Sequence, residues 1–138
     1  MNTLLSTSSS LSLIQQWLRN QNLPFTADDA VPSKGQGRWA IVFDQVRVHL
    51  MELHTGHVLL QARVTDVPAN ASDSEKLVTR AMQTASARMT MTDVGLSVDA
   101  DGTAMWLQVQ LPTHSTTHDL TQAVQRLVNE VELWRHAL

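Results

Sequence analysis

Apolar side chains recur at helical spacing in three separate stretches of the chain, which predicts three helices. These stretches cover residues 12–22, residues 72 to 89 or 91, and residues 116–138. Each one begins at a polar pair with the spacing of a capping box, in which two side chains satisfy backbone N–H groups of the first turn. The pairs are Ser12 with Gln15, Ser72 with Glu75, and Thr116 with Asp119. The pattern of the first helix also allows a start as early as Leu4.

Five shorter apolar or alternating runs have the features of strands. They cover residues 39–43, 46–50, 58–64, 94–98 and 105–111. Turn sequences lie at residues 54–57 and 99–102, and such tight turns require antiparallel pairing of the strands that they join. Residues 26–37 are polar and contain Pro32, which predicts a loop.

The elements therefore follow the order helix, three strands, helix, two strands, helix. This order predicts the α+β class, an antiparallel sheet with three helices packed on it. A length of 138 residues corresponds to about one domain, so we expect residues 1–138 to form a single domain.

Composition excludes several classes of function. The chain has no cysteine, which rules out disulfides and thiolate metal sites. Its net charge is −3 and no basic run is present, which argues against a nucleic-acid partner. The N-terminus lacks the features of a signal peptide, and no apolar run approaches the roughly 18 residues of a membrane span. We therefore expect a cytoplasmic protein that does not insert into a membrane.

No motif of known catalytic or metal-binding mechanism is present. Histidines 49, 54, 57, 114, 118 and 136 suggest a metal site, but no cysteine, HExxH motif or carboxylate cluster accompanies them. Asp99 and Asp101 resemble the start of a calcium loop, yet Gly102 is in the fourth position instead of the sixth, which favours a hairpin turn. We predict no catalytic residues, no metal and no cofactor, and hence a binding protein that is not an enzyme.

Some apolar side chains exceed what one covered sheet face needs. Trp106 falls on the otherwise polar face of its strand, and Met51 and Leu53 fall on the polar side of theirs. The first predicted helix also has a broad apolar side that includes Trp17. Either helices cover both faces of the sheet, or these side chains line an exposed groove for a partner.

The C-terminal third carries a family resemblance. Residues 94–107 read VGLSVDADGTAMWL, followed by Val109-Gln-Leu-Pro112 and a helix that ends Glu130-Val-Glu-Leu-Trp134. This hairpin, strand and helix with a late tryptophan resemble the class I type III secretion chaperones of Gram-negative bacteria, the CesT/SycE-like family. The order of elements and the acidic balance are similar over nearly the whole chain.

The resemblance implies a homodimeric chaperone without ATPase activity of its own. It would bind the N-terminal segment of a secreted effector, keep that segment extended and secretion-competent, and deliver it to the secretion machinery, with the secretion ATPase as a further candidate partner. Together with the apolar surplus, it suggests effector-binding residues Leu13, Ile14, Trp17, Met51 and Leu53. Its expected dimer interface comprises Leu77, Val78, Ala81, Met82, Ala85, Met89 and Trp106.

Two other functions fit the same pattern of elements. One is a dimeric scaffold of the roadblock or profilin-like kind, which binds folded partners. The other is a small-molecule-binding or enzymatic α+β domain, which would have a closed cavity with converging polar groups. Binding of an extended peptide would distinguish the chaperone from both.

Overall fold

A computed structural model describes residues 12–21, 25–27 and 37–138. The described elements are α2 (Leu13–Gln21), β1 (Phe25–Ala27), β2 (Arg38–Phe43), β3 (Val46–Glu52), β4 (Val58–Asp66), α3 (Ala71–Arg88), β5 (Gly95–Val98), β6 (Ala104–Leu111) and α4 (Thr117–Ala137). The predicted α+β class and the predicted order of elements are confirmed, with β1 as an addition. The possible helix start at Leu4 lies outside the described residues.

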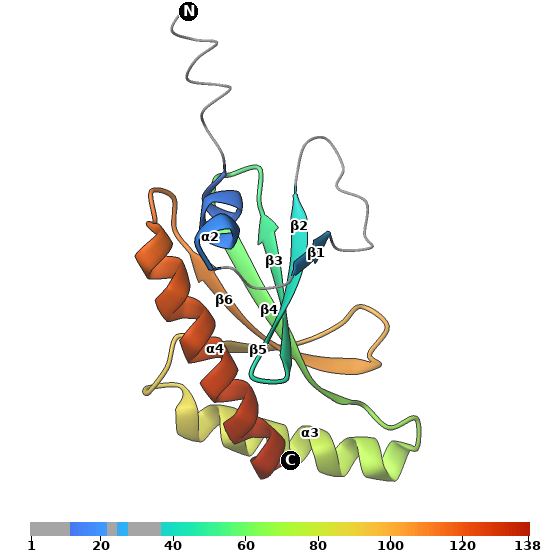
Figure 1. The fold of residues 1–138 in the computed structure, drawn as a ribbon. Helices are drawn as coiled ribbons and strands as arrows, with labels where there is room; N and C mark the ends of the chain where they lie inside the picture. The colour runs from blue at the N-terminus through green and yellow to red at the C-terminus, as the bar shows by residue number, and fades with distance from the viewer. Residues whose placement is uncertain (1–11, 22–24, 28–36) are drawn as a thin grey trace, which may run out of the picture.

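The strands form one antiparallel sheet in the order β1-β2-β3-β4-β6-β5. Figure 1 shows α2 and α4 lying together against the sheet, with α3 across one end of α4. β4 and β6 are neighbours although α3 and β5 lie between them in the sequence. The register between these two strands shifts between Arg63 and Thr65.

The prediction of a loop over residues 26–37 is wrong at its start, where β1 forms. Thr26 pairs with Ala40 of β2, and the strand has only three residues. Three residues are too few to show a two-residue period, so the strand follows from pairing with β2 and not from its own pattern. The remainder of the predicted loop that lies in residues 28–36 is outside the described residues.

A two-residue turn joins β2 to β3. Its residues, Asp44 and Gln45, have positive φ angles of 49° and 66°. Two consecutive positive φ angles are typical of the type I′ turn, whose twist matches that of the flanking strands. Phe43 therefore pairs directly with Val46, which sets the register of this hairpin.

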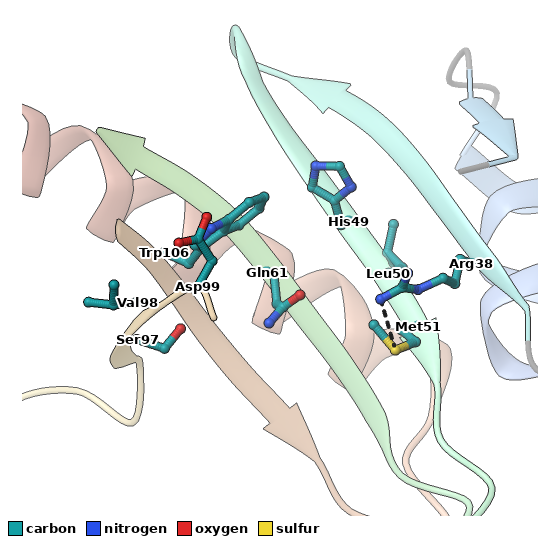
Figure 2. A pocket seen from close by; sticks show the side chains of 9 residues that line it. All are labelled: Arg38, His49, Leu50, Met51, Gln61, Ser97, Val98, Asp99 and Trp106. Atoms are coloured by element: carbon teal, nitrogen blue, oxygen red, sulfur yellow. Dashed lines mark hydrogen bonds between the residues drawn. The ribbon is translucent and has the colours of Figure 1, made fainter. Parts of the chain in front are cut away.

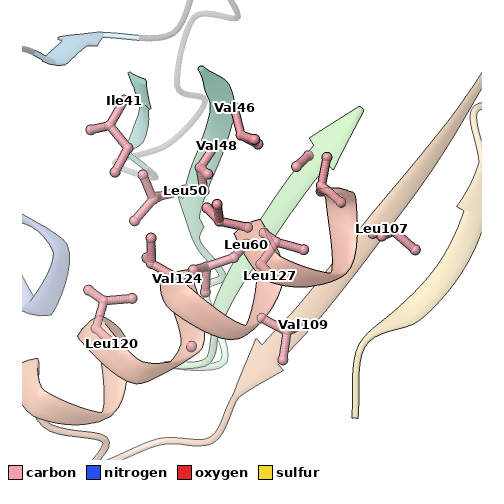
Figure 3. Close-up of a cluster of buried hydrophobic side chains, with 14 of the residues drawn as sticks. Ile41, Val46, Val48, Leu50, Leu60, Leu107, Val109, Leu120, Val124 and Leu127 are labelled. Atoms are coloured by element: carbon pink, nitrogen blue, oxygen red, sulfur yellow. The ribbon is translucent and has the colours of Figure 1, made fainter. Parts of the chain in front are cut away.

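The core lies between one face of the sheet and the helices. Every second residue of β3 points into it, beginning with Val46, Val48 and Leu50. Figure 3 shows these side chains meeting those of α4, including Leu120, Val124 and Leu127. α2 is linked to α4 by a 2.9 Å hydrogen bond that Trp17 Nε1 donates to Thr121 Oγ1.

Two of the three predicted capping boxes are confirmed. The backbone N–H of Gln15 donates to Ser12 Oγ and that of Ser12 donates to Gln15 Oε1, both at 3.2 Å. Thr116 and Asp119 form the same reciprocal pair at the start of α4.

The third capping box, Ser72 with Glu75, is wrong. Asn70 caps α3 instead, because its Oδ1 accepts the backbone N–H groups of Ser72 at 2.9 Å and Asp73 at 3.2 Å. Asparagine is among the strongest N-cap residues, and its cap leaves Ser72 inside the first turn.

Candidate functional site

The structure separates the five predicted effector-binding residues into two groups. Ile14 and Trp17 are 0% and 1% exposed and belong to the core, so they offer no surface to a partner. The reason is that α2 packs against both α4 and β3, and these two elements together cover its broad apolar side. Leu13, Met51 and Leu53 are half-buried and remain at the surface.

Leu13 and Leu53, which are distant in the sequence, line the same cavity. This Leu13–Leu53 cavity has a volume of about 120 Å³, and its walls are Leu13, Glu52, Leu53, Gly56, Val58, Pro112, His114 and Ser115. It lies where the start of α2, the β3–β4 turn and the segment after β6 meet. Gly56 has a φ angle of +91°, and a Cβ there would lie 2.9 Å from Thr113 Cγ2, so glycine lets the turn approach this segment.

Met51 lines a second hollow, on the sheet face opposite the core. This open-face groove has a volume of about 360 Å³, and its lining residues are Arg38, His49, Leu50, Met51, Gln61, Ser97, Val98, Asp99 and Trp106. Figure 2 shows that their side chains come from adjacent strands, with Arg38 and Met51 at one end and Trp106 and Asp99 toward the other. The groove therefore runs across the strands of the sheet.

Contacts within the open-face groove hold its side chains in place. The rings of His49 and Trp106 stack edge to face with centroids 5.5 Å apart. Arg38 Nη2 lies 3.6 Å from Met51 Sδ. Gln61 Nε2 donates a 3.2 Å hydrogen bond to Gln108 Oε1 across β4 and β6. Half-buried aromatic, thioether and amide groups together suit an extended peptide, which needs both apolar contacts and hydrogen-bonding partners.

Asp99 closes one end of the groove and is fixed by the β5–β6 turn. Its Oδ1 accepts the backbone N–H groups of Thr103 at 2.7 Å and Ala104 at 3.2 Å, and its Oδ2 accepts the Thr103 hydroxyl at 2.9 Å. The backbone hydrogen bond from Thr103 is the main cause that lowers the pKa of Asp99. This confirms the turn predicted at residues 99–102, where Gly102 has a φ angle of +69°.

The residues of the predicted dimer interface do not all lie on one surface. Val78 and Met82 of α3, and Met89 directly after its last residue, are exposed, at 42%, 62% and 74%. Leu77 and Ala85 are partly buried against the core. Trp106 lies in the open-face groove, and Ala81 is 1% exposed inside the core of its own chain. Ala81 therefore lies on the side of α3 that packs against its own domain. A surface helix buries one apolar side against the core, and only its other sides are open to a second chain.

An ion pair fixes α3 to α4. Arg88 of α3 binds the carboxylate of Glu130, which is 6% exposed, and Trp134 Nε1 donates a 3.2 Å hydrogen bond to Glu130 Oε2. Buried carboxylates are stable in proteins when charged or hydrogen-bonded partners compensate them, as both partners do here. This pair orients the exposed stripe of Val78, Met82 and Met89, which we call the α3 stripe.

The described residues contain no group of three or more His, Cys, Asp and Glu residues that could hold a metal ion. Within the same ranges, no helix is long and apolar enough to cross a bilayer. His49 and His114 instead line the open-face groove and the Leu13–Leu53 cavity respectively.

Several lining residues were missed by reasoning from the sequence. Arg38, Gln61 and Glu52 were not singled out, although one signal was available for Glu52. It continues the series Val46, Val48, Leu50 along β3, so its parity already indicated the core face. The alternation assigns Glu52 to the core face only if β3 is known to extend as far as residue 52.

Comparison with known proteins places this geometry in a family. The model of the Tir chaperone protein (CesT) family matches residues 12–135. No curated protein sequence matches the chain significantly.

Three solved structures have a similar fold. A chain of the heterodimeric ExoU-SpcU complex from the type III secretion system of Pseudomonas aeruginosa has 17% identity and a TM-score of 0.64, covering 91% of this chain and 97% of that one. A chain of the HopA1-SchA chaperone–effector complex has 16% identity and a TM-score of 0.60, with 90% and 91% covered. The Yersinia pestis structure of the type III secretion chaperone SycH with a YscM2 fragment has 15% identity and a TM-score of 0.56, with 89% and 97% covered.

At these identities the structural matches establish the fold. The family match covers most of the chain and agrees with the resemblance seen in the C-terminal third. It favours the chaperone over the scaffold and the small-molecule domain, and it sets the chain among chaperones and not among enzymes. The chain belongs to the Tir chaperone protein (CesT) family, the type III secretion chaperones.

Proposed function

We propose that the chain binds an N-terminal segment of a type III secreted effector and keeps it extended and secretion-competent. The observation that carries this proposal is the open-face groove. One face of the sheet is covered by α2 and α4, whereas Met51 and Trp106 remain half-buried on the other. In a chaperone, such a surface suits a client chain that has no fold of its own.

The shape and chemistry of the groove support an extended client. Successive side chains of a strand-like segment point in opposite directions. Every second residue of the client therefore faces the groove, and where these residues are apolar they can pack against Met51 and Trp106. Gln61, Ser97 and Arg38 offer hydrogen-bonding groups between these apolar contacts. The sheet also has two edge strands, β1 and β5, to which a client could add a strand.

The protein acts as a homodimer in this proposal, paired through the α3 stripe. The stripe exposes two methionines and a valine on a helix that otherwise contributes only Ala81 to the fully buried core. Methionine side chains adapt to irregular apolar surfaces, and a second copy offers the same chemistry in return. Leu77 and Ala85 at the border of the stripe would complete the contact.

The remaining properties follow from the same role. We propose that residues 1–138 act as one domain in the cytoplasm, without a cofactor, metal or membrane insertion. The complex would then pass to the secretion machinery, for which the secretion ATPase is the candidate receptor. The lack of basic runs is consistent with a partner other than nucleic acid.

The test begins with proteins that co-purify with the chaperone from its host. Each identified protein is divided into an N-terminal fragment of about 100 residues and the remainder, and calorimetry measures the binding of both to the purified chaperone. We expect the N-terminal fragment to bind and the remainder not to bind. Hydrogen exchange of the bound fragment should show no amides protected by helix formation outside the segment that contacts the chaperone. Binding of the folded remainder only would contradict the proposal.

A further inference from the structure

The sheet face opposite the core carries a local excess of positive charge. Its strand positions, which alternate with the buried ones, include the three arginines Arg38, Arg47 and Arg63 but only one acid, Asp66. Arg63 forms an ion pair with Asp66. Among the described residues, Arg38 and Arg47 form no ion pair. The whole chain has a net charge of −3, so this face departs in sign from the molecule as a whole.

Arg38 is the arginine of this face that lines the open-face groove. It is half-buried at the start of β2, directly opposite Met51 of β3. Its Nη2 atom donates to Met51 Sδ at 3.6 Å (Figure 2), and this sulfur is the only hydrogen-bond acceptor of the guanidinium in the described part of the chain. A thioether is a weak acceptor, whereas a guanidinium has five N–H donors in a fork that matches a carboxylate. Arg38 therefore has donors left for a carboxylate, beside an apolar neighbour.

The carboxylate that lines the groove does not neutralise Arg38. Asp99 lies toward the other end (Figure 2), and the β5–β6 turn takes up both of its oxygens through Thr103 and Ala104. Met51 lies beside Arg38, and Trp106 lies on the side of Asp99. The groove is therefore positive at one end and negative at the other, with an apolar side chain next to each charge.

We propose that the open-face groove selects a client segment with an aspartate or glutamate side chain, which binds Arg38 while neighbouring apolar side chains pack on Met51 and Trp106. The inference rests on the proposed function in that the segment comes from a client. An arginine and a carboxylate form two parallel hydrogen bonds, which fix the position of the acidic residue. Asp99 repels an acid at the other end, so the segment enters in one orientation. Apolar contacts alone are non-directional and would not set this orientation.

The test uses short peptides with blocked termini as probes of the groove. The sequence Leu-Ser-Glu-Ser-Leu places its leucines and its glutamate on one side of an extended chain, because successive side chains alternate. Two matched peptides carry glutamine or lysine in place of the glutamate. NMR follows the Trp106 indole N–H and the Met51 amide of the ¹⁵N-labelled full chain during titration. We expect saturable shifts with the glutamate peptide and at least about fivefold weaker binding of the glutamine peptide, because hydrogen bonds between charged groups are stronger than those of a neutral amide.

Charge reversal on the chain then locates the acidic side chain. Arg38→Glu should invert the order, so that the lysine peptide binds more tightly than the glutamate peptide. Arg19→Glu makes the same change in net charge at an exposed position of α2 and should keep the preference for glutamate. A preference for glutamate that survives Arg38→Glu, or that Arg19→Glu abolishes equally, would overturn the proposal. Equal binding of the glutamate and glutamine peptides by the unaltered chain, or no saturable shift, would also overturn it.

Two other sources of an anion for Arg38 are tested in parallel. Asp28 and Asp29 lie in the chain itself, outside the described residues. Tighter binding of the glutamate peptide after Asp28→Asn and Asp29→Asn would assign the arginine to these carboxylates. A short polyuridine RNA that displaced the glutamate peptide and bound more tightly would assign the face to nucleic acid, whose phosphates also attract arginine. Either result would overturn the proposal, and we expect neither.

Comparison of the three peptides on the unaltered chain keeps the test valid if Arg38→Glu fails to fold. Arg38→Gln then removes the charge without adding a carboxylate, and it should bind the glutamate and glutamine peptides equally. The outcome is also separable from the proposed function. Full affinity of Arg38→Glu for an identified client refutes this inference alone, whereas a chain that prefers the glutamate peptide but binds no N-terminal client fragment refutes the proposed function.

Discussion

The Nε atom of Arg88 on α3 lies 3.3 Å from Oε2 of Glu130 on α4, in an ion pair that joins the two helices. Replacing Arg88 by alanine leaves Glu130 buried beside Trp134 without its cation. We expect the free energy of unfolding to fall by at least about 1–3 kcal/mol, because that is the usual cost of leaving a buried polar group unsatisfied and the cost is larger for a charged group. Urea denaturation measures this change.

Arg126 provides the matched control for this substitution. It forms a 3.2 Å ion pair with Asp93, but both side chains are largely exposed. Exposed pairs contribute only about 0–1 kcal/mol, so Arg126→Ala should change the stability little. Equal effects of the two alanine substitutions would show that the Arg88–Glu130 pair does not anchor α3.

Met82→Asp should split the proposed homodimer and leave each chain folded. Met82 is 62% exposed at the centre of the α3 stripe, so a charge there is solvated in the monomer but buried in a dimer. Light scattering should give the mass of one chain, with a melting temperature within a few degrees of the original. Gln83→Asp, an exposed change on the same helix, should keep the dimer.

Ala81 behaves differently in this respect, because it is buried in its own chain. Ala81→Asp should lower the melting temperature strongly, since the carboxylate has no solvent or partner there. If Ala81→Asp instead gave a stable monomer, Ala81 would belong to the dimer contact as the sequence suggested.

Met51→Asp and Leu53→Asp should weaken client binding without unfolding the chain. Full burial of a large apolar side chain stabilises a fold by roughly 1.5–3 kcal/mol. Both residues are only half-buried, so each substitution removes no more than part of this stabilisation, and the new carboxylate still reaches solvent. Melting temperature and client affinity are measured on the same preparations. Unchanged affinity with an unchanged melting temperature would remove these residues from the site.

Two controls bracket that experiment. Leu50→Asp introduces a carboxylate at a position that is 0% exposed and should unfold the chain. Gln125→Asp lies on the exposed side of α4 and should affect neither stability nor client affinity.

Asp99→Asn should reduce stability in a pH-dependent manner. The pKa of Asp99 is lower in the folded chain than its usual value of about 3.9, mainly because of the backbone hydrogen bond from Thr103. The ionised group therefore stabilises the fold above pH 4, and this contribution is lost as the pH falls through the folded pKa. The difference in melting temperature between the two chains should be largest near neutral pH and shrink below pH 4.

Asp101→Asn is the matched control, an exposed aspartate in the same turn. Its melting temperature should follow that of the original chain at every pH. A constant difference between Asp99→Asn and the original chain from pH 7 to pH 2.5 would contradict the assigned role of the ionised Asp99.

Local rules were enough to predict most of the secondary structure. The caps at Ser12 and Thr116 depend on contacts three residues apart, which the sequence displays directly. The alternation of Val46, Val48 and Leu50 identifies the buried side of β3 in the same way. These features need no knowledge of the rest of the chain.

Features that depend on distant partners could not be predicted. β1 exists through its pairing with β2, and Trp17 is buried because α4 lies over it. The periodicity of a helix shows which sides are apolar, but not whether a partner protein or the same chain covers them. Of the five residues predicted to contact a client, Leu13, Met51 and Leu53 lie at the surface, whereas Ile14 and Trp17 lie in the core.

The pairing of β4 with β6 has a consequence for how the chain folds. β2, β3 and β4 follow one another through short turns. β6 can pair with β4 only when the long segment between them, which contains α3 and β5, has been closed into a loop. Closing a long loop costs entropy before its contacts form, so we expect β4 to remain an edge strand for part of the folding reaction. Its backbone groups are then free to pair with a second chain, and aggregation during refolding should rise steeply with protein concentration.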